Sequence, residues 1–535
     1  MRKPIIYLFL SVLVFATELY AEEAIIPHFD INRYILEGNT ALTSENIDKI
    51  LGRFTGKNRD FGDIQQAIEV LEASYKKLGY NLVTVLLPEQ ELEKGEIRIT
   101  VIEPRIKEVT VEGNKQYSRD NILNSIPNLR IGEMPNLNIL SENMRAANEN
   151  PGKKAVIQFQ SLNVPQELKA RIKVTDQRPL KLFASADNTG TIQSGEYRLG
   201  IGVQHYNLFD LDHIMALQYQ TSADYPSRVS IASGSYRIPF YTLGDTLDVY
   251  AGYSNVDNGT SQISGTDIQV SGQGIVAGVR YNLNLRRLGN YEHKLLFGAD
   301  YRFYDNSALL SGSELASDVT THPFSLTYIL GVKKHYINID GYLGVIHNEP
   351  WGHKGSQKDF ENSKNGANPR YWIIRYGTNI MAKPVGDWLA RFVVNAQYSD
   401  DRLISGEQLG LGGASSVRGY QEREESFDAG FYGSAELYTP DLAKILSISG
   451  AQIRLVAFYD AGYGYNNHIQ YGDNRYNTLE SAGAGLRVHL DEYFSFAIDG
   501  AVAMSDTINY KNLVFDIHPT KNGDNRIHFK AQITY

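Results

Sequence analysis

Between residues 180 and 535, apolar and polar side chains alternate with a period of two. The segments 247–254, 388–398 and 481–490 are clear examples, since every second side chain is apolar and most of the others are polar or glycine. This alternation is typical of β-strands with one apolar face and one hydrated face. About sixteen such segments can be placed, at about twenty-two residues for each strand with its connection, which suits membrane-crossing strands of about ten residues. The pattern predicts a transmembrane barrel of about sixteen antiparallel strands.

The connections between these segments alternate in length. Residues 383–387 form a tight turn, whereas residues 348–370 are long and polar. Outer-membrane barrels combine short periplasmic turns with long outer loops, and an even strand number leaves both chain ends on one side. The last segment carries Phe529 and Tyr535 on its apolar face. We expect this aromatic C-terminus to act as the signal for barrel assembly.

The residues before the barrel follow a different pattern, which occurs twice. Each copy opens with a strand that ends in Glu-Gly-Asn, at 37–39 and at 112–114, about 75 residues apart. Two segments with helical periodicity and two further strands complete the copy, which predicts the order β-α-α-β-β. In the first copy, Asp63 with Gln66 resembles a capping pair at the start of the second helix. The repeat indicates a duplicated small α+β domain.

Two helices on one face of a three-stranded mixed sheet leave an exposed strand edge. Such an edge can accept an extended peptide by β-augmentation. A second interpretation is that the two small domains are spacers that hold the barrel at a distance. The sequence leaves both interpretations open.

Composition and the N-terminus add the cellular context. Arg2 and Lys3 precede the apolar run 5–16, and Ala21 follows as a small residue before a cleavage site, which predicts a secretory signal peptide over 1–21 rather than a membrane anchor. The chain has 35 tyrosines, 3 tryptophans and no cysteine, so disulfides and thiolate metal sites are excluded. The net charge of −9 does not support a nucleic-acid partner. Alternation alone leaves a soluble β-sandwich or propeller open, but these features together favour the barrel.

One loop stands out for its chemistry. After the eleventh predicted strand, residues 410–424 read GLGGASSVRGYQERE, a glycine-rich stretch with several charges that need water or partners. Two strands later, alternation places Asp460 on the inward face of the wall. If the loop folds into the lumen, Arg418 can pair with Asp460 bidentately and hold the loop in place, although desolvation limits the net gain. A phosphate-binding loop is a poor match, because that motif needs Gly-Lys-Ser/Thr before a helix; a plain surface loop stays an alternative.

Taken in order, these motifs resemble those of the two-partner secretion outer-membrane transporters (TpsB type, the haemolysin/adhesin secretion-activation family). That family has two POTRA (polypeptide-transport-associated) domains and belongs to the superfamily of barrel-assembly and translocation proteins. The resemblance covers nearly the whole mature chain and rests on five segments: 79–103, 137–155, 187–200, 417–420 and 458–462. It implies a signal peptide over 1–21, POTRA domains over 22–104 and 105–178, and a 16-stranded barrel over 179–535 with an inward-folded loop at about 400–428.

The resemblance also implies roles for single residues. Arg418 would be the loop arginine that enters the barrel, and Asp460 would be its partner on the wall. Glu436, on the twelfth strand, matches more loosely and would be a further inward carboxylate. The residues that frame the pair are Val417, Gly419, Tyr420, Phe458 and Gly462.

The implied function is transport without catalysis. POTRA domains in the periplasm would capture an unfolded, β-rich partner protein (an adhesin, cytolysin or toxin), and the barrel in outer-membrane lipid would conduct it to the cell surface. Barrel-assembly machinery and periplasmic chaperones would insert the transporter itself, and no cofactor, metal ion or nucleic acid is expected. About eight residues separate Glu22 from the first strand, which is too few for the plug helix that many members carry.

The sequence features also bear on three other functions. A barrel-assembly factor shares the VRGY loop but usually has more front domains. An outer-membrane enzyme is disfavoured because the sequence contains neither an H-E-x-x-H motif nor a G-x-S-x-G motif. A passive porin would have no use for the front domains.

Overall fold

The computed structural model describes most of the chain after residue 26. The described ranges are 27–91, 94–191, 194–256, 260–262, 269–271, 273–305, 309–310, 313–314, 318–470, 473–507 and 519–535. The predicted signal peptide lies outside these ranges. The chain separates into two compact units: one holds the first front domain with residues 132–137 and 161–168, and the other holds the rest of the second front domain together with the barrel.

The first front domain is an α+β sandwich of helices and strands. Its elements are β1 (Phe29–Ile31), β2 (Arg33–Glu37), α1 (Ser44–Leu51), η1 (Gly52–Phe54), β3 (Gly56–Arg59), α2 (Phe61–Lys77), β4 (Thr84–Leu86) and β5 (Glu96–Ile102). The mixed sheet has the order β2-β5-β4, and β1 pairs with β3 in a separate two-stranded sheet. The predicted order β-α-α-β-β is therefore incomplete, because it omitted the short β1 and β3.

The start of α2 also differs from the prediction. Asp60 is the N-cap and forms a capping box with Asp63, so Asp63 pairs with the residue three positions before it and not with Gln66. The helix buries Ile64, Ala67, Leu71 and Tyr75, as its apolar periodicity predicts.

The repeated Glu-Gly-Asn turn has the same geometry in both front domains. Gly38 and Gly113 have φ values of +86° and +87°, and a Cβ on them would lie 2.3 Å from the Val101 carbonyl oxygen and 2.4 Å from the Val174 carbonyl oxygen. Only glycine tolerates both the left-handed backbone and this approach to the last strand of the domain. The repeat in the sequence is thus a repeat of one backbone constraint.

Two amide side chains cover part of the sheet edges. The Gln90 amide donates to the Arg98 carbonyl oxygen and accepts from the Arg98 N–H, both at 2.7 Å, so it replaces a neighbouring strand beyond the end of β4. In the second front domain, the Asn148 side chain accepts from the Ala155 N–H at 2.7 Å and donates to the Ala155 carbonyl oxygen at 3.0 Å. Each amide satisfies backbone groups at which another strand could otherwise pair.

The second front domain has the predicted order β-α-α-β-β. Its elements are β6 (Arg105–Glu112), α3 (Arg119–Asn124), α4 (Leu137–Ala147), β7 (Lys153–Ser161) and β8 (Glu167–Asp176), with the sheet order β6-β8-β7. The edges of this sheet are therefore β6 and β7.

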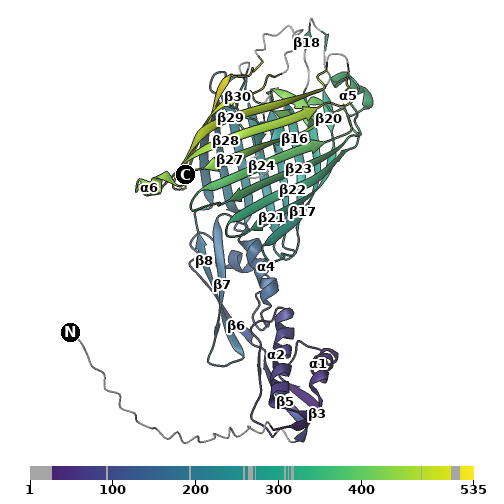
Figure 1. Cartoon of the computed structure of the whole chain (residues 1–535), viewed down its shortest axis with the longest axis vertical. Helices are drawn as coiled ribbons and strands as arrows, with labels where there is room; N and C mark the ends of the chain where they lie inside the picture. The colour runs from purple at the N-terminus through teal and green to yellow at the C-terminus, as the bar shows by residue number, and fades with distance from the viewer. Residues whose placement is uncertain are drawn as a thin grey trace, which may run out of the picture. The chain divides into compact units, whose positions relative to one another are not determined.

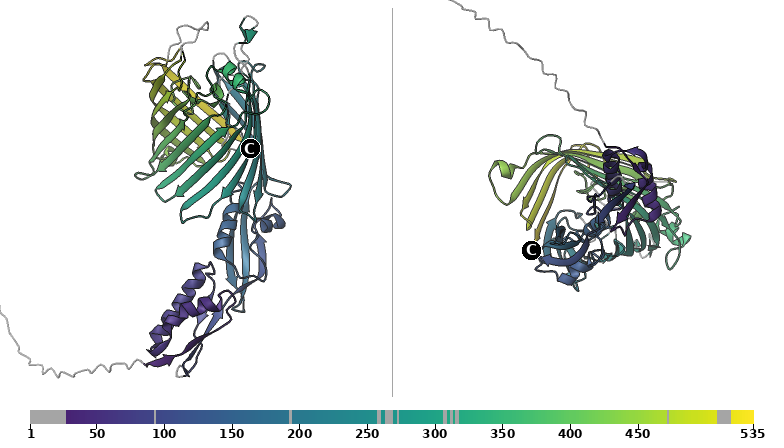
Figure 2. Two further views of the ribbon diagram at one scale, coloured as in Figure 1. Left: turned by 90° about the vertical axis from the view of Figure 1, so that its right-hand side faces the viewer. Right: turned by 90° about the horizontal axis from the view of Figure 1, so that it is seen from below.

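The barrel is closed and antiparallel, with β31 pairing with β9. Its strands are β9 (Leu180–Asp187), β10 (Arg198–Leu208), β11 (His213–Ser222), β12 (Ile231–Phe240), β13 (Asp245–Ser254), β16 (Gly274–Asn284), β17 (Tyr291–Tyr304), β20 (Val319–Thr321), β21 (Pro323–Lys333), β22 (Ile337–Asn348), β23 (Trp372–Ala382), β24 (Leu389–Tyr398), β27 (Ala429–Tyr438), β28 (Ala451–Tyr465), β29 (Tyr476–Leu490), β30 (Phe494–Ala503) and β31 (Asn525–Thr534). Both β20 and β21 pair with β17 on either side of His322, so the described residues form sixteen wall strands (Figure 1). Figure 2 shows the tilted strands from two further directions.

Shorter elements lie in the connections. They are β14 (Thr260–Gln262), β15 (Gln269–Ser271), β18 (Leu309–Leu310), β19 (Ser313–Glu314), α5 (Gln357–Ser363), η3 (Ser405–Glu407), β25 (Leu409–Leu411), β26 (Glu425–Phe427) and α6 (Leu442–Ile445). Within the described ranges, no helix is long and apolar enough to cross a bilayer.

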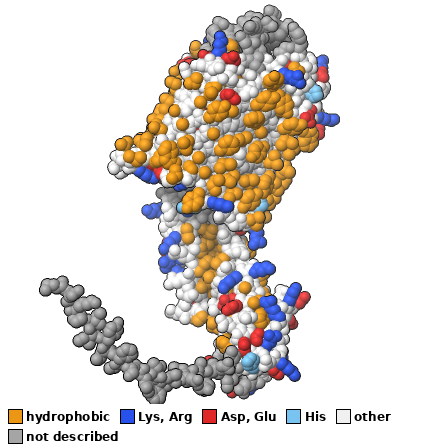
Figure 3. Space-filling model, in the orientation of Figure 1, with side chains coloured by type: hydrophobic (Ala, Val, Ile, Leu, Met, Phe, Trp, Pro, Cys, Tyr) orange, Lys and Arg blue, Asp and Glu red, His pale blue; other side chains and the backbone are white. Residues whose placement is uncertain are grey.

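The outer face of the barrel is apolar. Hydrophobic side chains, orange in Figure 3, cover the barrel face that this view presents. Along β13, Val249 and Tyr253 are exposed on the outer face of the barrel, whereas Asp248, Tyr250 and Ser254 are buried on the lumen side. Phe529 and Tyr535 lie on the lipid side near the end of the chain, where Tyr535 is exposed and exchanges two backbone hydrogen bonds with β9. The period of two in the sequence thus separates lipid from lumen.

Candidate functional site

The loop between β24 and β27, residues 399–428, contains the candidate residues. Its two limbs pair in the β25–β26 hairpin, where Leu409 lies opposite Phe427 and Leu411 opposite Glu425. The loop tip contacts inward-facing side chains of β27, β28, β30 and β31. The tip therefore lies against the inner wall of the barrel and not on the outer surface.

Arg418 is the central cation of the tip. Its Nε and Nη2 donate to the two carboxylate oxygens of Asp460 at 2.7 and 2.8 Å, and its backbone N–H donates to the same carboxylate at 3.1 Å. Nη2 also lies 2.9 Å from Oε1 of Glu436, and Nη1 lies 3.3 Å from Oδ2 of Asp499. Arg418 and these three carboxylates are all buried. One guanidinium is thus shared among carboxylates from three wall strands, β27, β28 and β30.

The residues that frame the pair make the close packing possible. The Arg418 guanidinium carbon lies 3.4 Å from the centre of the Phe458 ring, which is a cation–π contact. Gly419 has a φ of +94°, and its N–H donates to Nε2 of His528 at 3.0 Å. A Cβ on Gly462 would lie 3.0 Å from a methyl group of Val417, so glycine lets the loop approach β28 closely.

Tyr420 ends the VRGY motif and fixes the start of the second limb of the loop, which leads to β26. Its ring is buried, and its hydroxyl group donates to the Glu480 carbonyl oxygen at 2.8 Å and contacts the Ser505 backbone and side chain. Val417 and Tyr420 belong to a small apolar cluster with residues from the hairpin and the wall. Apolar burial and ion pairs therefore both hold residues 417–420 against the wall.

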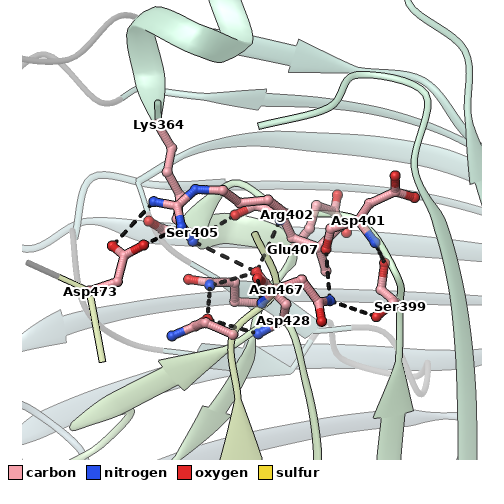
Figure 4. A network of polar contacts seen from close by, with 12 residues as sticks. Lys364, Ser399, Asp401, Arg402, Ser405, Glu407, Asp428, Asn467 and Asp473 are labelled. Carbon is pink, nitrogen blue, oxygen red and sulfur yellow. Dashed lines mark hydrogen bonds and ion pairs between the residues drawn. The ribbon is translucent and has the colours of Figure 1, made fainter. Parts of the chain in front are cut away.

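The two ends of the loop, around residues 402–403 and 428, form its neck. This neck is held by side chains from the outer loops (Figure 4). The buried Asp428 carboxylate accepts from the Leu403 N–H at 3.0 Å and from the Asn467 N–H at 2.9 Å, with Lys364 Nζ at 3.7 Å. Arg402 pairs with Asp473 in the loop between β28 and β29. Both ends of the loop are therefore fixed at the outer rim of the barrel.

The second front domain is joined to the barrel by a buried ion pair. Lys153, at the start of β7, pairs with Asp212 in the β10–β11 turn, and both side chains are fully buried. The Lys153 ammonium also donates to Asn121 at 2.8 Å, and the Tyr241 hydroxyl donates to Asp212 at 2.6 Å. Burial lowers the pKa of Lys153, which the nearby Asp212 carboxylate opposes. This junction ties β7 to the periplasmic end of the barrel.

Sequence reasoning paired Arg418 with Asp460, and the resemblance made Glu436 an inward carboxylate; the structure brings Glu436 to the same guanidinium and adds neighbours that the sequence analysis did not name. Asp499 and His528 have the inward parity of their strands, so alternation was the available signal for both. The Lys153–Asp212 pair and the pair of Glu407 with Arg302 have no local signal in the sequence, because the partners are distant from one another along the chain. Among the described residues, no group of three or more His, Asp or Glu side chains is placed to hold a metal ion.

Comparison with known proteins identifies the family. A model described as haemolysin secretion/activation protein ShlB/FhaC/HecB matches residues 168–488, and a ShlB-type POTRA domain model matches residues 29–104. The chain belongs to this family. It is accordingly an outer-membrane transporter of two-partner secretion, and its POTRA domains are periplasmic.

Individual relatives agree with this assignment. The heme/hemopexin transporter protein HuxB of Haemophilus influenzae is 23% identical over 498 residues, covering 89% of this chain and 83% of HuxB. The outer membrane transporter CdiB of Escherichia coli O6:K15:H31 is 26% identical over 479 residues, covering 86% of this chain and 76% of CdiB. The solved structure of CdiB from Escherichia coli has the same fold, with a TM-score of 0.73 at 20% identity over 97% of this chain and 93% of that one. CdiB from Acinetobacter baumannii gives a TM-score of 0.67 at 15% identity, over 95% and 90%.

Proposed function

We propose that the chain exports one large, β-rich partner protein in unfolded form, with POTRA domains over 22–104 and 105–178 and a conducting barrel over 179–535. The relatives include a heme/hemopexin transporter protein and the outer membrane transporter CdiB, and transport across the outer membrane is what the proposal extends to one partner protein. An adhesin, a cytolysin or a toxin fits the proposal equally. The observation that carries it is the ion-paired loop tip inside a closed barrel, which is an obstruction that can be released without breaking a covalent bond.

Capture is assigned to the free side of β7. Alternation along β7 directs the backbone N–H and C=O groups of Ile157 and Phe159 to the same edge as those of Ala155, which Asn148 already satisfies. An extended segment of the partner can add to this edge by β-augmentation. Because Lys153 holds the start of β7 at the barrel, a segment bound here lies close to the entrance of the barrel.

Translocation then requires the loop tip to leave the path. Arg418 and Asp460 are proposed as the lock between loop and wall, with Glu436 as a further carboxylate that the guanidinium can use. No nucleotide is available in the periplasm, so folding of the partner outside the cell supplies the pull. Chaperones and barrel-assembly machinery act on the transporter itself, before any transport.

The test is a secretion assay combined with a measurement of the amounts of all outer-membrane barrel proteins. Cells that lack this chain should lose one exported β-rich protein from the surface, while the amounts of other outer-membrane barrels stay unchanged. A general loss of barrels would instead identify an assembly factor and refute the proposal.

A second experiment tests the β7 edge. Ile157→Pro removes one N–H from the β7 edge and should weaken binding of the unfolded partner. Unchanged binding would refute the role of this edge.

A further inference from the structure

A second carboxylate–arginine contact holds the same loop at a different part of the wall. Glu407 ends η3 in the first limb of the loop and is fully buried. Arg302 Nη1, on β17, donates to both of its carboxylate oxygens at 2.9 Å. The Tyr304 hydroxyl donates to Oε1 at 2.9 Å. The carboxylate of Glu407 is therefore paired and hydrogen-bonded at both oxygens.

The surroundings of Glu407 are shaped for this contact. Arg302 Nη2 donates to Asp300 at 2.7 Å, which keeps the guanidinium aimed at the loop. A Cβ on Gly406 would lie 2.2 Å from the Tyr304 ring, so only glycine lets the limb pack this closely. Gln397, on β24, donates to the Glu407 carbonyl oxygen at 2.9 Å. The side chain and the backbone of Glu407 are therefore both fixed by hydrogen bonds to the wall.

The two contacts lie on well-separated strands and have opposite polarity. β17 is the seventh wall strand and β28 is the thirteenth in the barrel order. At the tip the loop supplies the cation and the wall supplies the carboxylates, whereas at Glu407 the loop supplies the carboxylate. Arg423 Nη2 donates to the Ser405 and Gln408 carbonyl oxygens, both at 3.2 Å, and thus ties the second limb to the first. Through this link and the β25–β26 pairing, the loop is one connected piece between its neck and its tip.

We propose that Glu407 is a second anchor of the loop and that the loop leaves the lumen only when both anchors are released. The neck around Asp428 then acts as the hinge, because it fixes the two ends of the loop at the outer rim. Loss of the Arg418 contacts alone frees the tip but leaves the first limb on β17. Loss of the Glu407 contacts alone leaves the tip on β28. The inference rests on the proposed role of the loop as the obstruction.

The experiment uses the absence of cysteine in the chain. Ser415, an exposed residue of the tip, is replaced by cysteine, and a bulky membrane-impermeant maleimide is added outside intact cells. Arg418→Ala and Glu407→Gln alone should label at about the rate of the parent, and the double variant should label at least about tenfold faster, because only it can swing outward. The matched control is Glu361→Gln, which removes an exposed carboxylate from α5 and should change nothing.

Two outcomes would overturn the inference. If Arg418→Ala alone labels as fast as the double variant, Glu407 does not hold the loop; if the double variant labels no faster than its parent, release of the two anchors does not free the loop. Heat-modifiable gel mobility checks that each variant has assembled. If Glu407→Gln does not assemble, Arg302→Lys replaces the planar fork by one ammonium group, and combined with Arg418→Ala it should give the same labelling. Faster labelling with unchanged secretion would keep the second anchor and refute the loop as the obstruction.

Discussion

Replacement of Arg418 by alanine removes the cation that the loop tip shares with three wall carboxylates. Asp460 is fully buried and accepts two side-chain hydrogen bonds from this guanidinium. Glu436 and Asp499 each keep a second arginine on a neighbouring strand. The energetic cost therefore falls mainly on one buried carboxylate, that of Asp460.

Breaking one buried ion pair by removing a partner costs about 3–5 kcal/mol. Since about 1.4 kcal/mol changes a population ratio tenfold, the ratio of docked to undocked tip should fall by roughly two to three and a half powers of ten. Hydrogen exchange of residues 412–424 in the full-length protein in detergent should accelerate by the same factor, because these amides exchange when the tip undocks. The variant should still insert into the membrane but secrete its partner poorly, because the loop loses the contact that fixes its position against the wall and to which it returns after each release.

A double-mutant cycle separates the pair from its surroundings. Arg418→Ala with Asp460→Ala leaves no orphan carboxylate at position 460, so its effect on exchange should be smaller than the sum of the two single effects. Arg370→Ala, an exposed arginine of an outer loop, is the control and should match the parent. Strictly additive effects, or wild-type exchange and secretion by Arg418→Ala, would refute the reasoning.

Two further predictions concern the second POTRA domain. Lys153→Met leaves Asp212 buried without its cation, which should cost about 3–5 kcal/mol and speed amide exchange in β7 roughly a hundredfold or more; unchanged exchange would exclude the junction as a tie between domain and barrel. Gly113→Ala should destabilise the domain by more than about 1 kcal/mol, because its Cβ would meet the Val174 carbonyl oxygen, whereas Gly132→Ala, at the same φ of +87° with open space around it, should cost less. Protease resistance of the two glycine variants, compared at equal assembly, measures the difference, and equal resistance would contradict the close-approach argument.

Local pattern predicted much of the wall and of the site. Alternation assigned Asp460 to the lumen, because successive side chains of a strand point to opposite faces and the neighbours of Asp460 are apolar. The same rule places Asp499 inward, although the prediction did not use it. It did not reveal the interruption at His322, since a break between two strands that share one partner leaves the period on each side intact.

The sequence could not predict the buried ion pairs of Glu407 and Lys153. Glu407 is one charge in a polar loop, and its partner Arg302 lies 105 residues earlier, on a strand of ordinary appearance. Lys153 sits at the start of a strand, where a lysine is normally hydrated, yet it is fully buried against Asp212. Sequence distance carries no information about such contacts, because they exist only when strands that never pair meet across the lumen or at its rim.

The amino-acid sequence alone determined which face of each strand meets lipid and about how many times the chain crosses the membrane. It also determined that two domains of one kind precede the barrel. These are local properties, set by the period of two and by a repeated glycine turn. Only the tertiary structure decided which charges meet: closure of the barrel sets the register between strands, and register decides whether an inward carboxylate faces a guanidinium or water. The three attachments of the loop, at its neck, at Glu407 and at Arg418, are consequences of that closure.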